Sequence, residues 1–283
     1  MSGSEGVLIL VGTPIGNLGD LSDRVLDTLR DADVLACEDT RRTRALLSHA
    51  GIAAGGRLRA VPAHDETHSV SWVVDAVTAG QRVAVVTDAG MPGISDPGAR
   101  LVRACLDAGL AVEAVPGPSA VTTALVLSGL PTDRFVFEGF LPRKGSTRTE
   151  RLHALRTEAR TTVIFESPRR VAATLTELGT HLGADRPAAL ARELTKLHEE
   201  VRRGTLAELS ASVEAKAPRG ECVIVVGGAG EVPTAASDAD IDAALATELA
   251  SGSSTRDAAA IVSARLGMAR REVYARAVRL NSR

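Results

Sequence analysis

The chain has 283 residues, of which 45% are hydrophobic and 24% are charged, so it is long enough to bury a sizeable core and has a globular composition. Its formal net charge is −2 at pH 7, which argues against a general binder of nucleic-acid backbone, because such proteins carry a clear cationic excess. No apolar run approaches the roughly 18 residues of a membrane span, and no signal peptide precedes the first expected strand. We therefore expect a cytoplasmic protein that does not enter a membrane, in which any contact with nucleic acid must come from local basic groups.

Neither the cysteines nor the histidines are spaced like metal ligands. Cys37, Cys105 and Cys222 lie far apart, each in or beside an apolar run, and there is no C-x-x-C pair. We expect them to be small core residues. The segment 64–68 contains two histidines and two acids, but its spacing fits no standard zinc motif, so no metal is expected.

Short apolar runs alternate with helical stretches over the first 230 residues, which is the pattern of parallel βαβ units. In the first half, strands are expected at 7–11, 33–37, 58–62, 82–87 and 111–115, with helices at 21–30, 41–50, 69–79 and 97–108. Asp39 and Thr40 are both candidates for the N-cap of the second helix.

The run Pro116-Gly117-Pro118 cannot continue a strand and predicts a junction between two domains. Beyond it we expect helices at 120–127, 148–157, 169–182 and 206–214, strands at 134–138, 161–165, 188–193 and 222–226, and an antiparallel strand near 200–203. The fold class is therefore predicted to be α/β. The predicted domains are an α/β domain at 1–117, a second α/β domain at 118–230 and a small helical appendage at 231–283.

The appendage reads as a helix from about 254, a turn at Gly267 and a second helix, with Thr255 as a candidate cap. This pattern resembles a helix-turn-helix. On its own it would suggest a DNA-binding regulator. Attached to a catalytic-looking α/β body, it favours an accessory that docks RNA or stabilises a dimer, with a passive helical hairpin as the alternative.

Four loops after expected strands are rich in glycine and proline: GTPIGNL (12–18), DAGMPGISDPG (88–98), VPGPSA (115–120) and FEGFLPRKG (137–145). Ligands of open α/β sheets bind beyond the carboxyl ends of the strands. Glycine there lets a ligand approach the backbone, and proline stiffens the loop. Together the loops predict a small-molecule pocket. The first is neither a dinucleotide fingerprint nor a Walker A loop, which argues against a nicotinamide dehydrogenase, a kinase or an ATPase.

With the later motifs FESPRR (165–170), RELTKLHEE (192–200) and GECVIVV (220–226), these loops resemble the tetrapyrrole-methylase superfamily. FESPRR and RELTKLHEE resemble its branch that methylates a cytidine 2′-hydroxyl in 16S ribosomal RNA, in the decoding region of the small subunit. The resemblance spans about residues 7 to 283. It implies two α/β domains with the active site in the cleft between them, S-adenosylmethionine as methyl donor, and a homodimer that acts on small-subunit ribosomal RNA or the 30S subunit.

By motif position, the resemblance implies a set of donor contacts from both halves of the chain: Pro14, Ile15, Gly16, Asp88, Gly90, Pro92, Gly93, Ser119, Ala120, Phe140 and Leu141. Methyl transfer from a sulfonium is an in-line displacement that needs no metal, so most of the catalysis can come from positioning. Stiff loops suit that task.

A ribose hydroxyl is a weak nucleophile at neutral pH, so a base or a cation should assist the loss of its proton. The second-half motifs supply several charged candidates. We expect Lys196 and Glu199 to lie nearest the 2′-oxygen, with Glu166 in reserve. The alternative, a structural ion-pair network at a domain or dimer interface, stays open.

Basic residues expected to contact RNA lie near three of the motifs: Arg41, Arg42, Arg143, Lys144, Arg169 and Arg170. For the first two a solvated helix face is the open alternative, and for the next two an exposed linker. Because the chain has only one Trp, one Tyr and four Phe, recognition should depend on shape and phosphate contacts more than on base stacking.

Two other functions remain as alternatives. A methyltransferase of the same fold could act on a precorrin or uroporphyrinogen, but the motifs at 165–170 and 192–200 and the appended tail argue against it. A helix-turn-helix regulator could use its α/β body to sense a ligand, and it would bind duplex DNA without transferring methyl groups.

Overall fold

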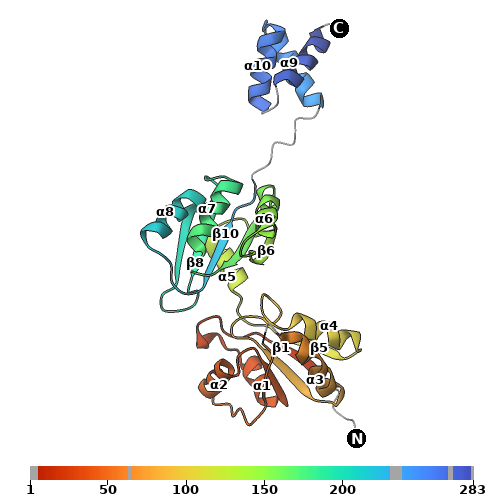
Figure 1. Cartoon of the computed structure of the whole chain (residues 1–283), viewed down its shortest axis with the longest axis vertical. Helices are drawn as coiled ribbons and strands as arrows, with labels where there is room; N and C mark the ends of the chain where they lie inside the picture. Colours follow the sequence, from red (N-terminus) through yellow and green to blue (C-terminus); the bar gives the residue numbers. More distant parts are fainter. Residues whose placement is uncertain (1–5, 63–64, 230–237, 267–269, 282–283) are drawn as a thin grey trace. The chain divides into compact units, whose positions relative to one another are not determined.

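The structure is a computed structural model that describes residues 6–62, 65–229, 238–266 and 270–281 (Figure 1). The chain divides into two compact units, Met1–Gly228 and Ala229–Arg283. The larger unit contains two five-stranded sheets, and the smaller contains helices alone among its described residues.

The first sheet is wholly parallel, with the strand order β3-β2-β4-β1-β5. β1 and β4 pair from Val7 opposite Arg82 to Val11 opposite Val86. Because all the strands run the same way, the loops that follow them meet at one edge of the sheet. The strands are β1 (Val7–Val11), β2 (Val34–Cys37), β3 (Leu58–Ala60), β4 (Arg82–Val86) and β5 (Ala111–Val115).

Helices cover both faces of this sheet (Figure 1). Successive strand residues point to opposite faces, so Ile9 joins a core with Leu29 and Leu47 from α1 and α2. Leu8 joins a separate core with Val73 from α3. The helical segments are η1 (Leu18–Asp20, a 3₁₀ turn), α1 (Asp23–Asp31), α2 (Thr40–His49), α3 (Glu66–Thr78) and α4 (Ala99–Asp107).

The starts of α2 and α3 bear on the expectations from the sequence. Asp39 is the N-cap of α2, because its carboxylate accepts a hydrogen bond of 2.8 Å from the Arg41 amide; this decides between the two expected candidates. α3 starts at Glu66 instead of residue 69. The Glu66 carboxylate accepts hydrogen bonds of 2.9 and 3.0 Å from the amides of Gly98 and Arg100, and this long-range contact with the start of α4 has no local sequence signal.

The second sheet is mixed, with the order β6-β7-β10-β8-β9. β6 and β7 are parallel, whereas β10 is antiparallel to both of its neighbours and β9 is antiparallel to β8, as expected for the strand near 200–203. The strands are β6 (Phe135–Phe140), β7 (Thr161–Glu166), β8 (Pro187–Arg192), β9 (Glu200–Thr205) and β10 (Cys222–Val226).

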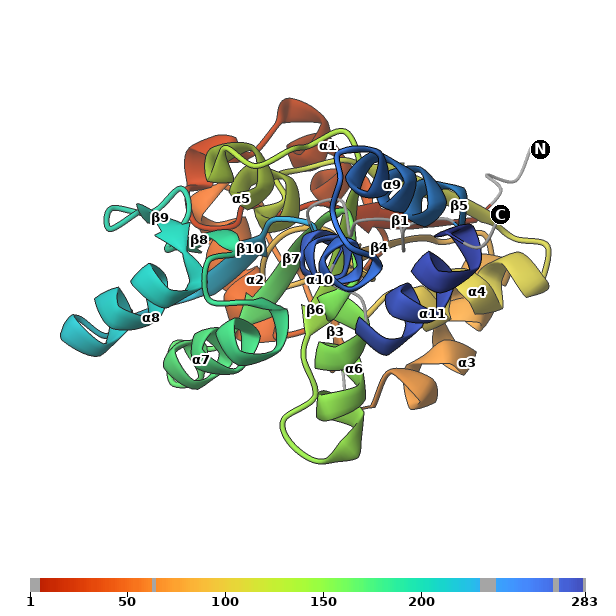
Figure 2. The same ribbon diagram turned by 90° about the horizontal axis from the view of Figure 1, so that it is seen from above.

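Figure 2 shows α5 on one side of β7, β10 and β8 and α7 and α8 on the other. The core under α5 also contains Ile15, from the loop after β1, packed with Val121 and Leu125. A side chain of the first half is thus part of the core of the second. The helices of this half are α5 (Ala120–Ser128), α6 (Ser146–Arg156), α7 (Val171–Leu182) and α8 (Leu206–Ala215).

The smaller unit packs α9 (Asp238–Ala250), α10 (Thr255–Leu266) and α11 (Arg270–Asn281) around a core of Ile241, Leu245, Ala258, Ala259, Val262, Val273 and Ala277. Arg276 forms ion pairs with Asp238 and Asp242, which joins α11 to α9. The cap of α10 is Ser254 and not Thr255, because the Asp257 amide donates to the Ser254 hydroxyl. The expected turn at Gly267 lies outside the described residues.

No helix in the described ranges combines the length and the apolarity needed to cross a bilayer. Within the same ranges, no three His, Cys, Asp or Glu side chains are grouped so that they could hold a metal ion. Cys37, Cys105 and Cys222 are buried free thiols, as expected. His64 of the segment 64–68 lies outside the described residues.

Candidate active site

A cavity of about 600 Å³, here called the cleft cavity, lies between the two halves of the larger unit. The loops after β1, β2, β4, β5, β7 and β8 contribute to its wall, together with Phe140 at the end of β6. The residues that line it are Ile15, Glu38, Arg42, Asp88, Ala89, Gly90, Met91, Ile94, Ser95, Asp96, Ser119, Ala120, Val121, Phe140, Phe165, Glu166, Ser167, Pro168, Glu193, Leu194, Lys196, Gly220, Glu221, Cys222 and Val223.

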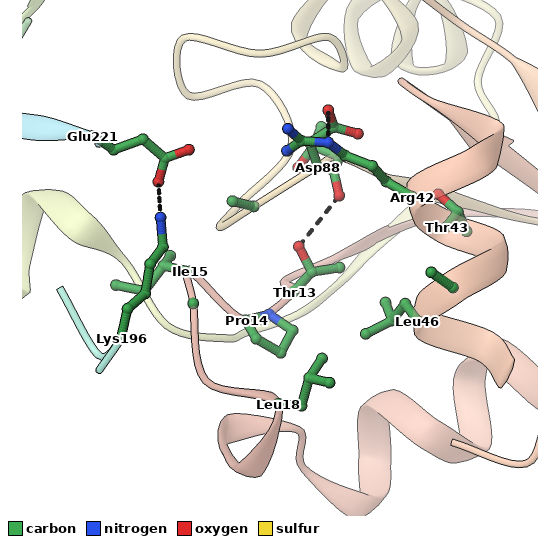
Figure 3. A pocket seen from close by; sticks show the side chains of 14 residues that line it. Thr13, Pro14, Ile15, Leu18, Arg42, Thr43, Leu46, Asp88, Lys196 and Glu221 are labelled. Atoms are coloured by element: carbon green, nitrogen blue, oxygen red, sulfur yellow. Dashed lines mark hydrogen bonds and ion pairs between the residues drawn. The ribbon is translucent and has the colours of Figure 1, made fainter. Parts of the chain in front are cut away.

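A smaller pocket of about 310 Å³, here called the side pocket, shares six lining residues with the cleft cavity, among them Arg42, Asp88, Lys196 and Glu221. Figure 3 shows Lys196 and Glu221 on one side and Arg42 and Asp88 on the other, with Pro14 and Leu18 below them. Both hollows therefore open onto the same group of charged side chains.

Glycines allow the two halves to approach closely. A Cβ atom on Gly12 would lie 2.5 Å from the backbone nitrogen of Gly117. A Cβ atom on Gly16 would lie 2.4 Å from Cγ of Lys196 and 2.9 Å from the carbonyl oxygen of Leu194. These distances are too short for any side chain, so the two glycines of the GTPIGNL loop are required by packing.

Six carboxylate residues line the cleft cavity, and four of them interact electrostatically and form a negative wall: Glu38, Asp88, Asp96 and Glu221. Burial raises the pKa of Asp96 to about 7, and the charges of the other three act in the same direction. Burial also raises the pKa of Glu38 and of Asp88. Such a wall favours a cationic ligand, because a positive charge would relieve the repulsion among the acids.

Three buried side-chain atoms make no hydrogen bond in the described part of the chain: Oδ1 of Asp88, Oγ1 of Thr87 and Oγ1 of Thr195. An unsatisfied buried acceptor is costly. The other oxygen of Asp88 lies 3.4 Å from Nε of Arg42. Asp88 therefore retains one oxygen without a hydrogen-bond donor, in a residue that lines both hollows.

Lys196 is held between two acids. Its Nζ donates hydrogen bonds of 2.9 Å to Glu193 and to Glu221. Burial opposes the charged ammonium, but these hydrogen bonds outweigh burial and raise the pKa of Lys196. Glu193 and Thr195 have φ values of 51° and 65°, in the left-handed region that costs non-glycine residues energy. The loop is thus held in a strained conformation that places the ammonium at the cavity.

Glu166 belongs to a buried network. Only 2% of its surface is exposed, and its carboxylate accepts hydrogen bonds of 2.8 Å from the Ser167 amide and from the Thr174 hydroxyl. Thr174 in turn accepts from Arg148 at 3.0 Å, and Arg170 lies 3.3 Å from Glu166. With both oxygens engaged, Glu166 is suited to positioning the loop after β7 and poorly suited to accepting a proton from a ligand.

Two family profiles match the chain: one described as Tetrapyrrole (Corrin/Porphyrin) Methylases matches residues 7–210, and one described as RsmI C-terminal HTH domain matches residues 235–281. The ribosomal RNA small subunit methyltransferase I of Mycobacterium tuberculosis is 53% identical over 226 residues, which cover 80% of this chain and 79% of that protein. The Synechocystis sp. protein of the same name is 42% identical over 272 residues, 95% of this chain and 96% of that one. The chain belongs to the ribosomal RNA small subunit methyltransferase I family.

Membership of the ribosomal RNA small subunit methyltransferase I family confirms the family resemblance and the fold class predicted from the loop motifs. Among solved structures, a cobalt-precorrin-4 methyltransferase superposes with a TM-score of 0.59 at 20% identity, over 80% of this chain and 97% of that chain. At this identity the likeness shows the shared fold alone.

The motifs that indicated the ribosomal RNA small subunit methyltransferase I family bring most of the expected donor residues to the two hollows. Ile15, Asp88, Gly90, Ser119, Ala120 and Phe140 line the cleft cavity, and Pro14, Ile15, Gly16 and Asp88 line the side pocket. Pro92, Gly93 and Leu141 line neither of these two hollows. Leu141 lies in the core beneath α6 and α7.

The expected catalytic residues are separated by the structure. Lys196 lines both hollows, whereas Glu199 lines neither, and its carboxylate accepts a hydrogen bond of 2.6 Å from the Thr195 amide. The acids on the Lys196 ammonium are Glu193 and Glu221, which the expected pair did not include. The site residues predicted from the motifs did not include Asp96 either, although the DAGMPGISDPG motif contains it.

The residues expected at RNA occupy different environments. Arg42 lines both hollows, and Arg169 lines a third cavity on the second half. Arg41 is exposed and pairs with its own N-cap, Asp39. Arg143 and Lys144 are exposed. Arg170 faces inward, donating a hydrogen bond of 3.1 Å to the carbonyl oxygen of Leu141.

Proposed function

We propose that this protein is an S-adenosylmethionine-dependent methyltransferase that modifies the 2′-hydroxyl of a cytidine in 16S ribosomal RNA. Membership of the ribosomal RNA small subunit methyltransferase I family supports the reaction and the substrate. The observation that carries the proposal is the cleft cavity, a ligand-sized space with a negative wall that includes Asp88, a residue with one unsatisfied buried oxygen. Its volume falls within the range of small-molecule sites.

The residues of the cleft cavity suit the proposed donor. Asp88 offers a free acceptor, the acid wall favours a cation, and Ile15 and Phe140 supply apolar contact. When bound, S-adenosylmethionine supplies an electrophilic methyl group on a positively charged sulfur. The donor-binding residues proposed from the motifs include Pro14, Gly16, Gly90, Ser119 and Ala120 at the walls, with Pro92, Gly93 and Leu141 shaping the loops behind them.

In the proposed reaction a bond forms between the ribose 2′-oxygen and the methyl carbon while the carbon–sulfur bond breaks, and the hydroxyl proton must leave. Lys196 brings a permanent positive charge to the cavity, which favours the developing negative charge on the oxygen. Asp96, with its pKa near neutrality, is placed to hold a released proton. Glu166 positions the loop after β7, and Glu199 stabilises the turn at Thr195 by accepting a hydrogen bond from its amide.

The proposed biological setting is the one that the family resemblance implies. The substrate is small-subunit ribosomal RNA or the 30S subunit, the enzyme works in the cytoplasm, and it is a homodimer. The proposed domains are 1–117, 118–230 and 231–283, with Arg41, Arg42, Arg143, Lys144 and Arg169 available to RNA and the helical unit as an accessory to docking.

A direct assay tests this function. The purified protein is incubated with methyl-labelled donor and either 30S subunits from a strain that lacks this modification or uroporphyrinogen III. We expect label in 16S RNA, in a nucleotide that mass spectrometry identifies as 2′-O-methylcytidine. Label in the tetrapyrrole alone would instead establish the alternative substrate. Specific duplex-DNA binding without methyl transfer would support the regulator and overturn the proposal.

A further inference from the structure

A cavity of about 810 Å³ lies on the second α/β half, outside the cleft cavity. Its walls come from the loop after β7, the end of β8, the start of β9 and the segment between α8 and β10. We call it the basic basin. The residues that line it are Pro168, Arg169, Arg192, His198, Glu200, Arg202, Lys216, Ala217, Pro218, Arg219 and Gly220.

The basic basin concentrates positive charge in a chain that is negative overall. Four arginines and one lysine line it, against the single carboxylate of Glu200, whereas the whole chain has a net charge of −2. With His198 neutral, the lining therefore carries a net charge of +4. A concave surface with charge of one sign raises the local concentration of its counter-ions.

Two of the four arginines, Arg192 and Arg202, are held in place by hydrogen bonds to backbone carbonyl oxygens. Arg192 donates hydrogen bonds of 2.8 and 3.0 Å to the carbonyl oxygens of Arg219 and His198. Arg202 donates at 3.1 Å to the carbonyl oxygens of Ser212 and Lys216. Carbonyl oxygens fix a guanidinium without neutralising it. Glu200 is shared between both arginines, at 3.4 Å and 2.9 Å, and so offsets only one of the two charges.

The other three cations of the basic basin are available to an external anion. Arg169, Lys216 and Arg219 are exposed, and none of them forms an ion pair with any residue that the structure describes. No intramolecular partner would be lost when they bind an anion. A guanidinium presents a planar fork of donors that matches a phosphate group.

The basic basin adjoins the cleft cavity, because Pro168 and Gly220 line both. Gly220 has a φ of 80°, and a Cβ atom there would lie 2.1 Å from Oε1 of Glu193. Glu193 is one of the two acids that hold Lys196. The segment that carries Lys216 and Arg219 is thus packed directly against the support of the Lys196 ammonium.

We propose that the basic basin binds backbone phosphates of the RNA strand whose ribose enters the cleft cavity. This inference rests on the proposed function and adds where the flanking strand lies. A polyanion is the ligand class that four net positive charges and free guanidinium groups favour. A single-stranded segment fits best, because its backbone can follow a concave wall from the basin to the cleft, unlike a regular duplex.

The test compares wild-type protein with the double variant Lys216→Gln/Arg219→Gln. Binding of a fluorescent single-stranded RNA oligonucleotide is followed by anisotropy over a series of salt concentrations. Each phosphate contact to single-stranded nucleic acid contributes about 0.7 to the slope of log affinity against log salt. We expect the double variant to bind RNA more weakly and to lower that slope by about 1.4.

Arg134→Gln is the matched control. Arg134 is exposed and precedes β6, so it lies at the opposite edge of the sheet from Phe140 and the cleft cavity. The Arg134→Gln substitution removes one exposed positive charge and should leave the slope of log affinity against log salt unchanged. Affinity for S-adenosylmethionine, measured by calorimetry, should be the same in all variants, because none of the three residues lines the cleft cavity.

Two results would overturn the inference. The first is a double variant that binds the oligonucleotide with wild-type affinity and slope. The second is a loss of affinity for assembled 30S subunits alone, with free RNA bound normally, which would assign the basin to an acidic ribosomal protein. If the wild-type protein takes up no S-adenosylmethionine and methylates no RNA, the proposed function itself fails, which separates the two outcomes.

Discussion

The ammonium nitrogen of Lys196 lies 2.9 Å from a carboxylate oxygen of Glu221, a residue that immediately precedes β10 and is 25 positions away in the chain. The same ammonium contacts Glu193, and the alkyl chain of Lys196 lies against Gly16 of the first half. One side chain therefore links the strained loop after β8, the start of β10 and the loop after β1.

Replacing Lys196 tests whether its charge serves the chemistry. Lys196→Met retains an alkyl chain against Gly16 and removes the ammonium. We expect kcat for RNA methylation to fall about 100-fold or more, the range associated with positioned groups that assist proton transfer. Because the ammonium also holds Glu193 and Glu221, we expect a lower melting temperature as well, so turnover is compared at a temperature at which both proteins are folded. The measurement is single-turnover methylation together with calorimetric binding of the donor.

Glu199→Gln is the comparison for Lys196→Met. Because Glu199 lines neither hollow, we expect near-wild-type kcat. A large loss in Glu199→Gln combined with near-normal turnover in Lys196→Met would contradict this assignment.

Gly16→Ala tests the close approach of the two halves. The new methyl group would meet Lys196 and the Leu194 carbonyl below 3.0 Å, so we expect a loss of about 1 to 3 kcal/mol in unfolding free energy, typical of overpacking, and weaker donor binding. Gly179→Ala in α7 is the control, since its nearest contact would be an ordinary 3.8 Å. It should stabilise the protein by up to about 1 kcal/mol through helix propensity. Equal effects on stability would refute the packing argument.

Thr174→Val tests the network around Glu166. The substitution keeps the shape and removes the hydroxyl that donates to Glu166 and accepts from Arg148. We expect the unfolding free energy to drop by about 1 to 3 kcal/mol, since buried charged groups lose a partner. Thr176→Val, on the exposed side of the same helix, should change it by about 0.5 kcal/mol or less. Urea denaturation measures both. A Thr174 variant as stable as wild type would show that the network contributes nothing.

Asp96 predicts a pH dependence of stability. Its folded pKa of about 7 lies above the ordinary value of 3.8, so between these values the folded state binds more protons than the unfolded state. Stability from this group is full below pH 3.8 and is lost as the pH rises through about 7. Asp96→Asn should remove this dependence. The unfolding free energy of Asp96→Asn minus that of the wild type, measured by urea titration, should increase from pH 3.8 to about 7. A difference that does not change with pH would exclude the assignment.

The same carboxylate should distinguish donor from product. A sulfonium cation favours ionised Asp96, so S-adenosylmethionine should bind more tightly as the pH rises through about 7. S-adenosylhomocysteine, whose sulfur is neutral, should show a weaker trend. Calorimetric affinities for both ligands, repeated with Asp96→Asn, measure the effect. Identical pH profiles for the two ligands would place the positive charge away from this acid.

Local sequence patterns predicted much of the fold. The alternation of apolar runs identified all five strands of the first sheet, because buried parallel strands are short and continuously apolar. The antiparallel strand near 200–203 was expected and forms part of β9. The start of α3 was misplaced: the helix begins at Glu66. The Glu66 carboxylate accepts from the amides of Gly98 and Arg100 at the start of α4, a contact between residues far apart in the chain.

Other site assignments needed side-chain partners. Lys196, Glu166 and Glu199 looked alike as charged residues in second-half motifs. The structure separates them. The Lys196 ammonium lies at the cavity. The carboxylate of Glu166 accepts hydrogen bonds from Thr174 and Ser167, and that of Glu199 accepts one from a backbone amide. Such partners come from different strands and loops, so motif position alone cannot assign them.

The sequence by itself determined that the chain is an α/β protein of the tetrapyrrole-methylase family and that its glycine- and proline-rich loops lie after strands. Repeating apolar periodicity and loop composition are local properties, and both are readable in the order of residues. Tertiary structure alone decided that Glu193 and Glu221 hold Lys196, that Asp96 titrates near neutrality, and that five cations gather in the basic basin. These properties depend on burial and on distances between residues that only folding brings together.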